Sequence, residues 1–422
     1  MFEQLTNSHY LKQLVEEVEA QIRPIHSQIE KTAEKNQFRV LESFRKNRVS
    51  DFHLQISTGY GYDDQGRDTL EAVYADVFGC ESALVRPQMI SGTHAIATAL
   101  FGILRPGDEL IYITGNPYDT LEEIVGIRGE ENGSLKEFGI SYNAIPLTEE
   151  GTVHFDAVKK AMTEKTKMIG IQRSKGYANR PSFTIAEIKE MVEFVKGINP
   201  EIIVFVDNCY GEFVEEVEPT HVGVDLMAGS LIKNPGGGLA KVGGYIVGKE
   251  KLVDLCGYRL LSPGIGKEAG PTLYSLLEMY QGFFLAPHVV SQALKGAVFT
   301  AAFLEKLGMK TNPKWNSKRT DLIQSVEFND KDRMIAFCQT IQQASPIDSY
   351  VTPVPSYMPG YEDDVIMAAG TFIQGSSIEL SADGPIRPPY VAYIQGGLTY
   401  EHVKIANLLA VDTLLTKGLI KK

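Results

Sequence analysis

Short apolar segments alternate with helical segments from about residue 70 to residue 206. Helices are predicted over 70–77 and 92–104, where apolar residues recur at helical spacing. The predicted strands are short apolar runs bounded by helices or turns, over 83–85, 109–113, 142–145, 168–171 and 202–206. This alternation is typical of a mostly parallel sheet with helices on both faces. Ligands of such folds bind beyond the carboxyl ends of the strands, so chemistry is expected from the residues that follow them.

The length of the chain predicts more than one domain, because 422 residues exceed the usual size of a single hydrophobic core. We predict an N-terminal helical segment over 1–55, a large α/β domain over 56–290 and a small α+β domain over 291–422. A long helix over 8–47 is expected to kink or split at Pro24. A helix that joins the two lobes and the elements of the small domain are expected over 286–307, 322–328, 332–343, 365–368, 377–380 and 402–417.

A lysine in an apolar, glycine-rich turn follows a strand that ends in a carboxylate. The strand ends in Val-Asp-Asn-Cys-Tyr at 206–210, and the turn reads Ser-Leu-Ile-Lys-Asn-Pro-Gly-Gly-Gly at 230–238. This order suits pyridoxal phosphate (PLP), whose aldehyde forms a Schiff base with a lysine and whose pyridine nitrogen is kept protonated by an aspartate. We therefore predict that Lys233 and Asp207 bind PLP, and that burial lowers the pKa of Lys233. The alternative is a lysine that only caps a strand end.

Three further segments follow predicted strands and could contact the same cofactor. Gly92 and Thr93 open a helix, where free N–H groups and the helix dipole favour phosphate, although an ordinary helix cap would look the same. Tyr118 could stack on the pyridine ring, and Asn179 could bond to the phenolic oxygen of the cofactor. Each of these two also has a purely structural reading, as a loop tyrosine and a turn asparagine.

Two arginines lie in turns outside this group. Arg67 follows Tyr62 in the glycine-rich segment 59–67, which could equally be a solvated loop. Arg387 lies in a proline-rich turn of the predicted small domain, where a guanidinium could fork onto a substrate carboxylate. The alternative for Arg387 is an ordinary surface arginine.

Composition excludes several classes of function. The net charge of −12 leaves no basic excess to neutralise phosphates, which argues against nucleic-acid binding. The four cysteines are scattered without a CxxC pair, so we expect neither a metal site nor a disulfide framework. We see no signal peptide and no apolar run of about 18 residues that could span a membrane, so we expect a cytoplasmic protein without a membrane partner.

The order of these motifs resembles that of the fold-type I PLP enzymes, and within them the Cys/Met-metabolism group of lyases and transsulfuration enzymes. The chain is most similar to the methionine gamma-lyase-like family often labelled aluminium resistance proteins, over nearly its whole length. The segments that carry the resemblance lie at 60–64, 91–96, 206–213 and 228–238. It implies a mostly parallel, seven-stranded type of sheet with helices on both faces and a small α+β C-terminal domain.

The resemblance also implies roles for individual residues. Lys233 is the Schiff-base lysine and proton shuttle, Asp207 pairs with the pyridinium nitrogen, and Tyr118 stacks on the ring. The phosphate is bound by the backbone of Gly92 and Thr93 and by the hydroxyl of Ser230.

In the better-known lyases a tyrosine and an arginine from the neighbouring subunit reach the phosphate. Their nearest counterparts here are Tyr62 and Arg67, which implies a homodimer or a homotetramer with shared sites. Two features depart from those lyases. Ile232 replaces a hydroxyl residue of their Ser-x-Thr-Lys motif, and Arg387 lies a few residues before the position of their carboxylate-binding arginine.

These readings favour a PLP-dependent carbon–sulfur lyase acting on a sulfur-containing amino acid, of the cystathionine beta-lyase or methionine gamma-lyase type. A different PLP reaction, of the aldolase, aminotransferase or racemase type, would need the same residues. A non-catalytic, stress-related protein that keeps the fold is the third alternative, and the intact Lys233 and Asp207 argue against it.

Overall fold

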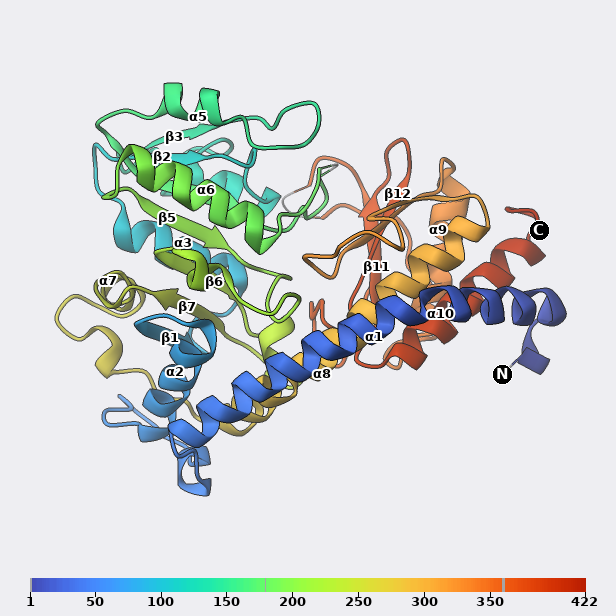
Figure 1. The fold of residues 1–422 in the computed structure, drawn as a ribbon, viewed down its shortest axis with the longest axis horizontal. Coiled ribbons are helices and arrows are strands. Elements are labelled where there is room, and N and C mark those ends of the chain that lie inside the picture. The colour runs from blue at the N-terminus through green and yellow to red at the C-terminus, as the bar shows by residue number, and fades with distance from the viewer. Residues whose placement is uncertain (1, 179, 359–360) are drawn as a thin grey trace. The chain divides into compact units, whose positions relative to one another are not determined.

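The computed structural model describes residues 2–178, 180–358 and 361–422, which form two compact units (Figure 1). The first unit is Gln37–Phe284. The second joins the described residues up to Asn36 with Leu285–Lys422. The predicted domains, 1–55, 56–290 and 291–422, have other bounds than these compact units and stay a prediction.

Seven strands form one sheet in the first unit, in the order β1-β7-β6-β5-β4-β2-β3. The five strands from β6 to β3 run parallel, whereas β7 is antiparallel to both of its neighbours. The strands are β1 (Ser82–Arg86), β2 (Glu109–Tyr112), β3 (Ser141–Ala144), β4 (Thr166–Gln172), β5 (Ile203–Asp207), β6 (Leu226–Ser230) and β7 (Gly244–Gly248). The predicted mostly parallel α/β sheet is confirmed.

Helices cover both faces of this sheet, with α6 in front of it and α3 behind it in Figure 1. On the α3 face, Leu100 of α3 and Phe205 of β5 belong to one buried apolar cluster, which also includes Val253 of α7. The burial explains why β5 reads as a continuous apolar run, since both of its faces are covered. The helices of this unit are α2 (Gln65–Phe78), α3 (Gly92–Ile103), α4 (Glu122–Val125), α5 (Phe155–Ala161), α6 (Ile185–Ile198) and α7 (Glu250–Leu260).

The second unit is built on a five-stranded antiparallel sheet in the order β10-β11-β12-β9-β8. Its elements are β8 (Lys310–Asn312), β9 (Gln324–Glu327), α9 (Lys331–Gln343), β10 (Val365–Ala368), β11 (Ser381–Pro385), β12 (Val391–Gln395) and α10 (Tyr400–Thr416). This α+β architecture was predicted for the C-terminal part of the chain. The strand expected over 377–380 is wrong, because the chain enters the sheet only at Ser381.

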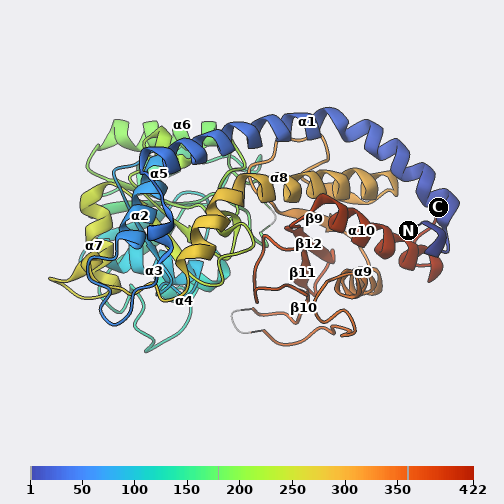
Figure 2. The same ribbon diagram turned by 90° about the horizontal axis from the view of Figure 1, so that it is seen from below.

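Two long helices contribute to both units: α1 (Ser8–Lys46) and α8 (Leu276–Lys306). Helix α1 continues through Pro24, so it is not split there. Figure 2 shows α1 bending along its N-terminal half, as expected where a proline removes a helical hydrogen bond.

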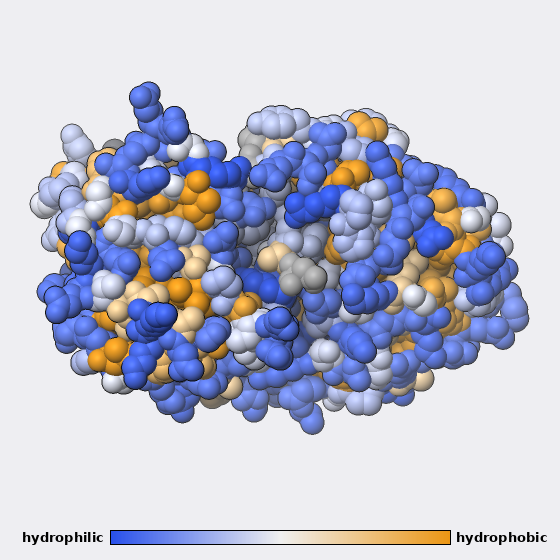
Figure 3. All heavy atoms as spheres, turned by 90° about the horizontal axis from the view of Figure 1, so that it is seen from above, coloured by the Kyte–Doolittle hydropathy of each residue, from blue (hydrophilic) through white to orange (hydrophobic). Residues whose placement is uncertain are grey.

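The surface of the molecule is mainly hydrophilic on the face that Figure 3 draws. On the face drawn in Figure 3, hydrophilic side chains predominate and apolar side chains gather in separate patches. Among the described residues, no helix combines the length and apolar character that crossing a membrane requires.

Candidate active site

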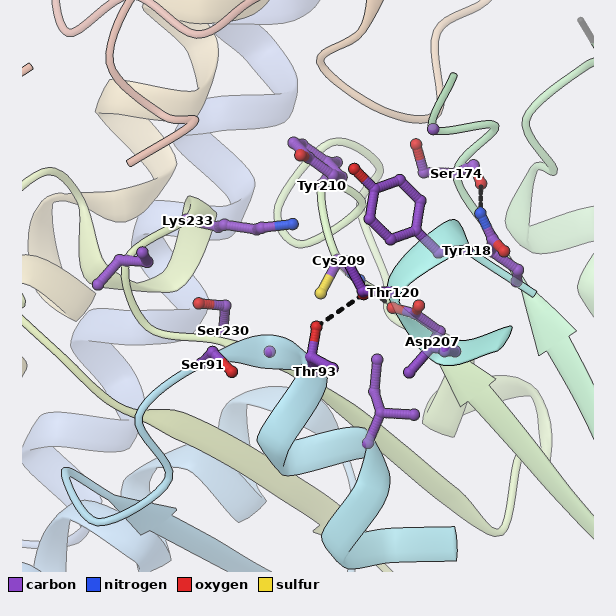
Figure 4. Close-up of a pocket in the computed structure, with 16 residues that line it drawn as sticks. Ser91, Thr93, Tyr118, Thr120, Ser174, Asp207, Cys209, Tyr210, Ser230 and Lys233 are labelled. Atoms are coloured by element: carbon purple, nitrogen blue, oxygen red, sulfur yellow. Dashed lines mark hydrogen bonds between the residues drawn. The ribbon is translucent and has the colours of Figure 1, made fainter. Parts of the chain in front are cut away.

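A pocket in the first unit brings six of the predicted site residues together (Figure 4). It opens at the carboxyl ends of β4, β5 and β6 and at the first turn of α3, where ligands of parallel α/β sheets bind. The predicted residues that line it are Gly92, Thr93, Tyr118, Asp207, Ser230 and Lys233.

The start of α3 forms one wall of the pocket. Ser91 caps this helix by accepting a hydrogen bond from the backbone N–H of His94 at 3.1 Å. A Cβ on Gly92 would lie 3.1 Å from Cys209 Sγ and 3.2 Å from Ser230 Cβ, so glycine allows the helix to approach β6 closely. The first turn of a helix carries N–H groups without intrahelical partners, which suits an anion at this wall.

Two hydroxyl groups beside this helix start add to its polar character. The Ser230 side chain is buried, and its hydroxyl oxygen has no hydrogen-bond partner among the described residues. The hydroxyls of Thr93 and Thr120 lie 2.9 Å apart. A buried hydroxyl without a partner is costly unless a ligand satisfies it, so the wall fits a phosphate group.

Asp207 ends β5 as a buried carboxylate. It accepts a hydrogen bond from the backbone N–H of Cys209 at 3.1 Å. Burial raises the pKa of Asp207, while the positive charge of Lys233 opposes that increase. A buried carboxylate of this kind fits the protonated nitrogen of a pyridine ring.

Lys233 extends into the pocket from the turn after β6 (Figure 4). Its Nζ lies 3.7 Å from the ring centre of Tyr210. Burial lowers the pKa of Lys233, but the electrostatic effects of Cys209, Tyr210 and Asp207 outweigh burial and hold that pKa above its ordinary value. The prediction of a lowered pKa is therefore wrong for the chain without cofactor, because it omitted these neighbours.

Tyr118 presents its ring to the same space (Figure 4). The ring packs over Gly176, whose φ is +55° and where a Cβ would lie 2.8 Å from a ring carbon. A side chain at residue 176 would therefore displace Tyr118. Its position suits stacking on a flat ligand.

Three predicted residues are not among those that line the pocket. Tyr62 is 55% exposed, and its ring stacks on Tyr60 with the ring centres 5.5 Å apart. Arg67 is buried in α2, where its guanidinium donates to the carbonyl oxygens of Gly61 at 2.6 Å, Gly270 at 3.1 Å and Glu268 at 3.3 Å. Arg387 lies in the second unit in an exposed ion pair with Asp363 at 3.1 Å, and Asn179 lies outside the described residues.

Some residues of the site were not predicted as such. Cys209 and Tyr210 line the pocket, and Glu212 is buried close by with its Oε1 accepting from the Tyr245 hydroxyl at 2.6 Å. Burial raises the pKa of Glu212 to about 8. Their position directly after Asp207 was the available signal, since residues after a strand end face the ligand.

The described residues show no cluster of His, Cys, Asp and Glu that could hold a metal ion. The donors that are present match the three parts of PLP instead. Lys233 would take its aldehyde, Asp207 its pyridine nitrogen, and Ser230 with the α3 start its phosphate. The residues therefore fit the cofactor.

Comparison with known proteins agrees with this fit. The family model described as "Methionine gamma-lyase" matches residues 11–415. The YnbB protein of Bacillus subtilis is 73% identical over the full length of both chains. The structure of a proposed cystathionine beta-lyase involved in aluminium resistance from Listeria monocytogenes is 68% identical, covers 95% of this chain and 99% of its own, and superposes with a TM-score of 0.94.

A more distant structure shares the fold alone. The PLP-dependent protein YhfS of Escherichia coli is 15% identical, covers 91% of this chain and 96% of its own, and superposes with a TM-score of 0.60. The predicted fold-type I architecture is thereby confirmed, and PLP is the cofactor of the family. The chain belongs to the methionine gamma-lyase family and is a PLP-dependent lyase.

Proposed function

We propose that the chain is a carbon–sulfur lyase that acts on a sulfur-containing amino acid of the cystathionine or methionine type, with its cofactor attached to Lys233. The observation that supports this proposal is the pocket that places Lys233, Asp207 and Ser230 together at the strand ends. The name of the Listeria monocytogenes relative, which refers to cystathionine beta-lyase, agrees with it.

The proposed roles follow from the side chains that line the pocket. When bound, PLP supplies an electron sink for negative charge on the α-carbon of the substrate. Nζ of Lys233 accepts the proton from the α-carbon of the substrate and later returns a proton. Asp207 keeps the pyridine nitrogen protonated, and the Tyr118 ring stacks on the cofactor.

We propose that the phosphate is held by the backbone N–H groups of Gly92 and Thr93 and by the Ser230 hydroxyl. Ile232 leaves this wall one hydroxyl short of the better-known lyases. The Thr120 hydroxyl, 2.9 Å from that of Thr93, is a candidate to replace it. Each of these groups donates to an oxygen anion.

We retain Arg387 as the proposed ligand of the substrate carboxylate. Its ion pair with Asp363 joins two side chains that are 55% and 37% exposed. Exposed pairs of this kind contribute about 0–1 kcal/mol, so a substrate carboxylate can compete for the guanidinium. For the same reason Arg387→Ala should raise KM without lowering the thermal stability of the protein.

A second copy of the chain is the proposed partner, with active sites shared between the copies. The loop that carries Tyr62 exposes two aromatic rings, with Tyr60 at 73% and Tyr62 at 55% exposure. It is joined to the segment around Leu273 by backbone hydrogen bonds from Gly270 to Tyr60 and from Leu273 to Ser57. Because Arg67 is bonded within its own chain, Tyr62 is the stronger candidate to reach a neighbouring phosphate.

Two measurements on the purified protein test the proposed function. After borohydride reduction, mass spectrometry should find the pyridoxyl group on Lys233, and an adduct on another lysine would contradict the proposed attachment. Pyruvate, ammonia and a thiol from cystathionine indicate β-elimination, whereas 2-oxobutyrate, ammonia and methanethiol from methionine indicate γ-elimination. A keto acid formed without free ammonia would favour the aminotransferase alternative.

A further inference from the structure

The backbone of Tyr210 has an unusual conformation. Its φ is +74°, in the left-handed region that a residue with a bulky side chain rarely adopts. Such strain persists only where the surroundings enforce it, and it concentrates at functional sites. The structure shows both what holds this turn and what the turn presents.

Two buried side chains hold the turn by hydrogen bonds. Arg173 donates to Asn208 Oδ1 at 2.8 Å and to the carbonyl oxygen of Gly211 at 3.0 Å. Asn234 donates to the carbonyl oxygens of Tyr210 at 3.1 Å and Glu212 at 2.9 Å. Because Asn234 directly follows Lys233, the same hydrogen bonds connect the tyrosine turn to the lysine turn.

The turn presents the Tyr210 ring to the lysine amine. Nζ of Lys233 lies 3.7 Å from the ring centre, within the range of a cation–π interaction. The interaction is stronger in a site shielded from water than at an exposed surface. The face of the ring attracts the ammonium form of the amine and has no comparable attraction for the neutral form.

The other titratable groups near Nζ do not replace this contact. Asp207 is the nearby carboxylate, and it is the proposed partner of the pyridine nitrogen. Burial raises the pKa of the Cys209 thiol well above its ordinary value, and it raises the pKa of Glu212 to about 8. The ring contact remains available to stabilise a positive charge on Nζ once Asp207 faces the cofactor.

We propose that Tyr210 is a positioning residue for Lys233: its ring receives the amine in the ammonium form that follows proton removal from the substrate. In that step the C–H bond at the α-carbon breaks, its electron pair stays on the substrate, for which bound PLP would be the electron sink, and its proton moves to Nζ. The resulting cation lies against the ring. This inference rests on the proposed role of Lys233. The strained turn maintains the ring position before any proton is transferred.

The test uses the full-length chain freed of cofactor and measures the rate at which added PLP attaches to Lys233, by absorbance, from pH 6 to pH 11. Only the neutral amine reacts, and the pKa of Lys233 lies above its ordinary value. The attachment rate therefore rises about tenfold per pH unit over this range, and the displacement of the profile along the pH axis gives the change in its midpoint. Tyr210→Leu removes the ring face and should move the midpoint down by about one pH unit, which corresponds to an interaction of roughly 1.4 kcal/mol. Tyr210→Phe retains the ring face and should leave the midpoint unchanged.

Further variants at residue 210 separate the effect of the ring on the midpoint from the effect of the strained backbone. Tyr210→Gly accepts a positive φ freely, and it should shift the midpoint as much as Tyr210→Leu does. Phenylalanines with one to three ring fluorines at residue 210 preserve the size while weakening the ring face, and the midpoint should fall stepwise with each fluorine.

The possible outcomes are distinguishable. A wild-type midpoint in Tyr210→Leu and Tyr210→Gly would overturn the inference, as would an equal shift in Tyr210→Phe, which would assign the effect to the hydroxyl. If Tyr210→Leu does not fold, the fluorinated series decides in the same way. Attachment that persists in Lys233→Ala would contradict the proposed function instead.

Discussion

At the residue scale, Asp207 is the carboxylate on which the electronics of the site depend. Asp207→Asn preserves the shape of the side chain but removes the charge that keeps the pyridine nitrogen protonated. One charge-assisted hydrogen bond is worth about 1.5–3 kcal/mol, so we expect PLP affinity to fall roughly tenfold or more. An absorbance titration with PLP measures the change.

The matched control for this variant is Asp254→Asn. Asp254 is a partly exposed carboxylate paired with Lys267 at 3.0 Å, and exposed pairs contribute little to stability. We expect its PLP affinity to equal that of the wild type. Wild-type affinity in Asp207→Asn as well would remove Asp207 from the cofactor site.

Glu212 predicts a pH dependence of stability. The folded chain retains the proton on this side chain up to about pH 8, whereas the unfolded chain releases it near the ordinary value of 4.5. Folding therefore takes up a proton between these values, and stability falls as the pH rises through that window. Glu212→Gln cannot titrate, so the free energy of unfolding of the wild type minus that of the variant should fall by roughly 1.4 kcal/mol per pH unit.

Urea unfolding of both proteins at pH 5, 6, 7 and 8 measures this difference. Other titrating groups are common to the two proteins and cancel, provided that they do not contact Glu212. A constant difference across the four pH values would show that Glu212 is ionised in the folded chain.

The sequence alone could identify Lys233 and Asp207, because a strand that ends in a carboxylate and an apolar turn that contains a lysine are both local patterns. It could not identify the surroundings of Arg67, since the carbonyl oxygens that surround it belong to Gly61, Glu268 and Gly270. Two of those residues are distant in the sequence. Nor does the sequence reveal the positive φ of Tyr210, which depends on Arg173 and Asn234.

At the scale of elements, the turn that carries Lys233 is packed too tightly for any side chain at Gly236. A Cβ there would lie 1.7 Å from the carbonyl oxygen of Leu231, and a Cβ on Gly282 of α8 would lie 2.1 Å from the carbonyl oxygen of Gly236. Gly236→Ala must therefore displace the turn. We expect PLP attachment to slow at least tenfold and the thermal midpoint to fall.

Gly197 in α6 provides the control, because a Cβ at this position would meet nothing within 4 Å. Alanine favours a helix over glycine by about 0.5–1 kcal/mol, so Gly197→Ala should retain PLP attachment and keep or raise the thermal midpoint. Differential scanning calorimetry and the absorbance assay test both variants. Normal attachment in Gly236→Ala would mean that the lysine turn tolerates displacement.

The elements that could be predicted are those with continuous apolar runs, such as 202–206. Strand β6, with Leu-Met-Ala-Gly-Ser, was not predicted because alanine, glycine and serine are weak strand formers. Its Gly229 is required by packing, since a Cβ there would lie 2.6 Å from Tyr245 and 2.7 Å from Glu212. Local propensity does not contain that tertiary requirement.

At the scale of the whole molecule, the proposed shared site predicts complementation between two impaired chains. Tyr62→Ala should lower activity because the neighbouring phosphate loses a donor, and Lys233→Ala should abolish it. In a mixed dimer, one site combines an intact Lys233 with an intact Tyr62 from the other chain. We expect mixing to restore up to half of the wild-type activity per mixed dimer.

Light scattering and differently tagged chains verify that mixed dimers form. A mixture that contains mixed dimers but is no more active than the two variants measured separately would contradict a site shared through Tyr62. A fully active monomer would contradict the shared site altogether. Lys233→Ala mixed with Arg67→Ala tests in the same way whether Arg67 also crosses to the neighbour.

The antiparallel strand β7 has a consequence for how the site assembles. Ser230 at the end of β6 pairs with Gly244 at the start of β7, so the lysine turn is the loop of a hairpin. Closing a short loop between strands that are neighbours in sequence loses little chain entropy and is fast. The start of α3, by contrast, must find the lysine turn across more than a hundred residues of chain. During folding, the lysine turn and Ser230 can therefore form together before the start of α3 reaches them, and the cofactor site is complete only after that later contact.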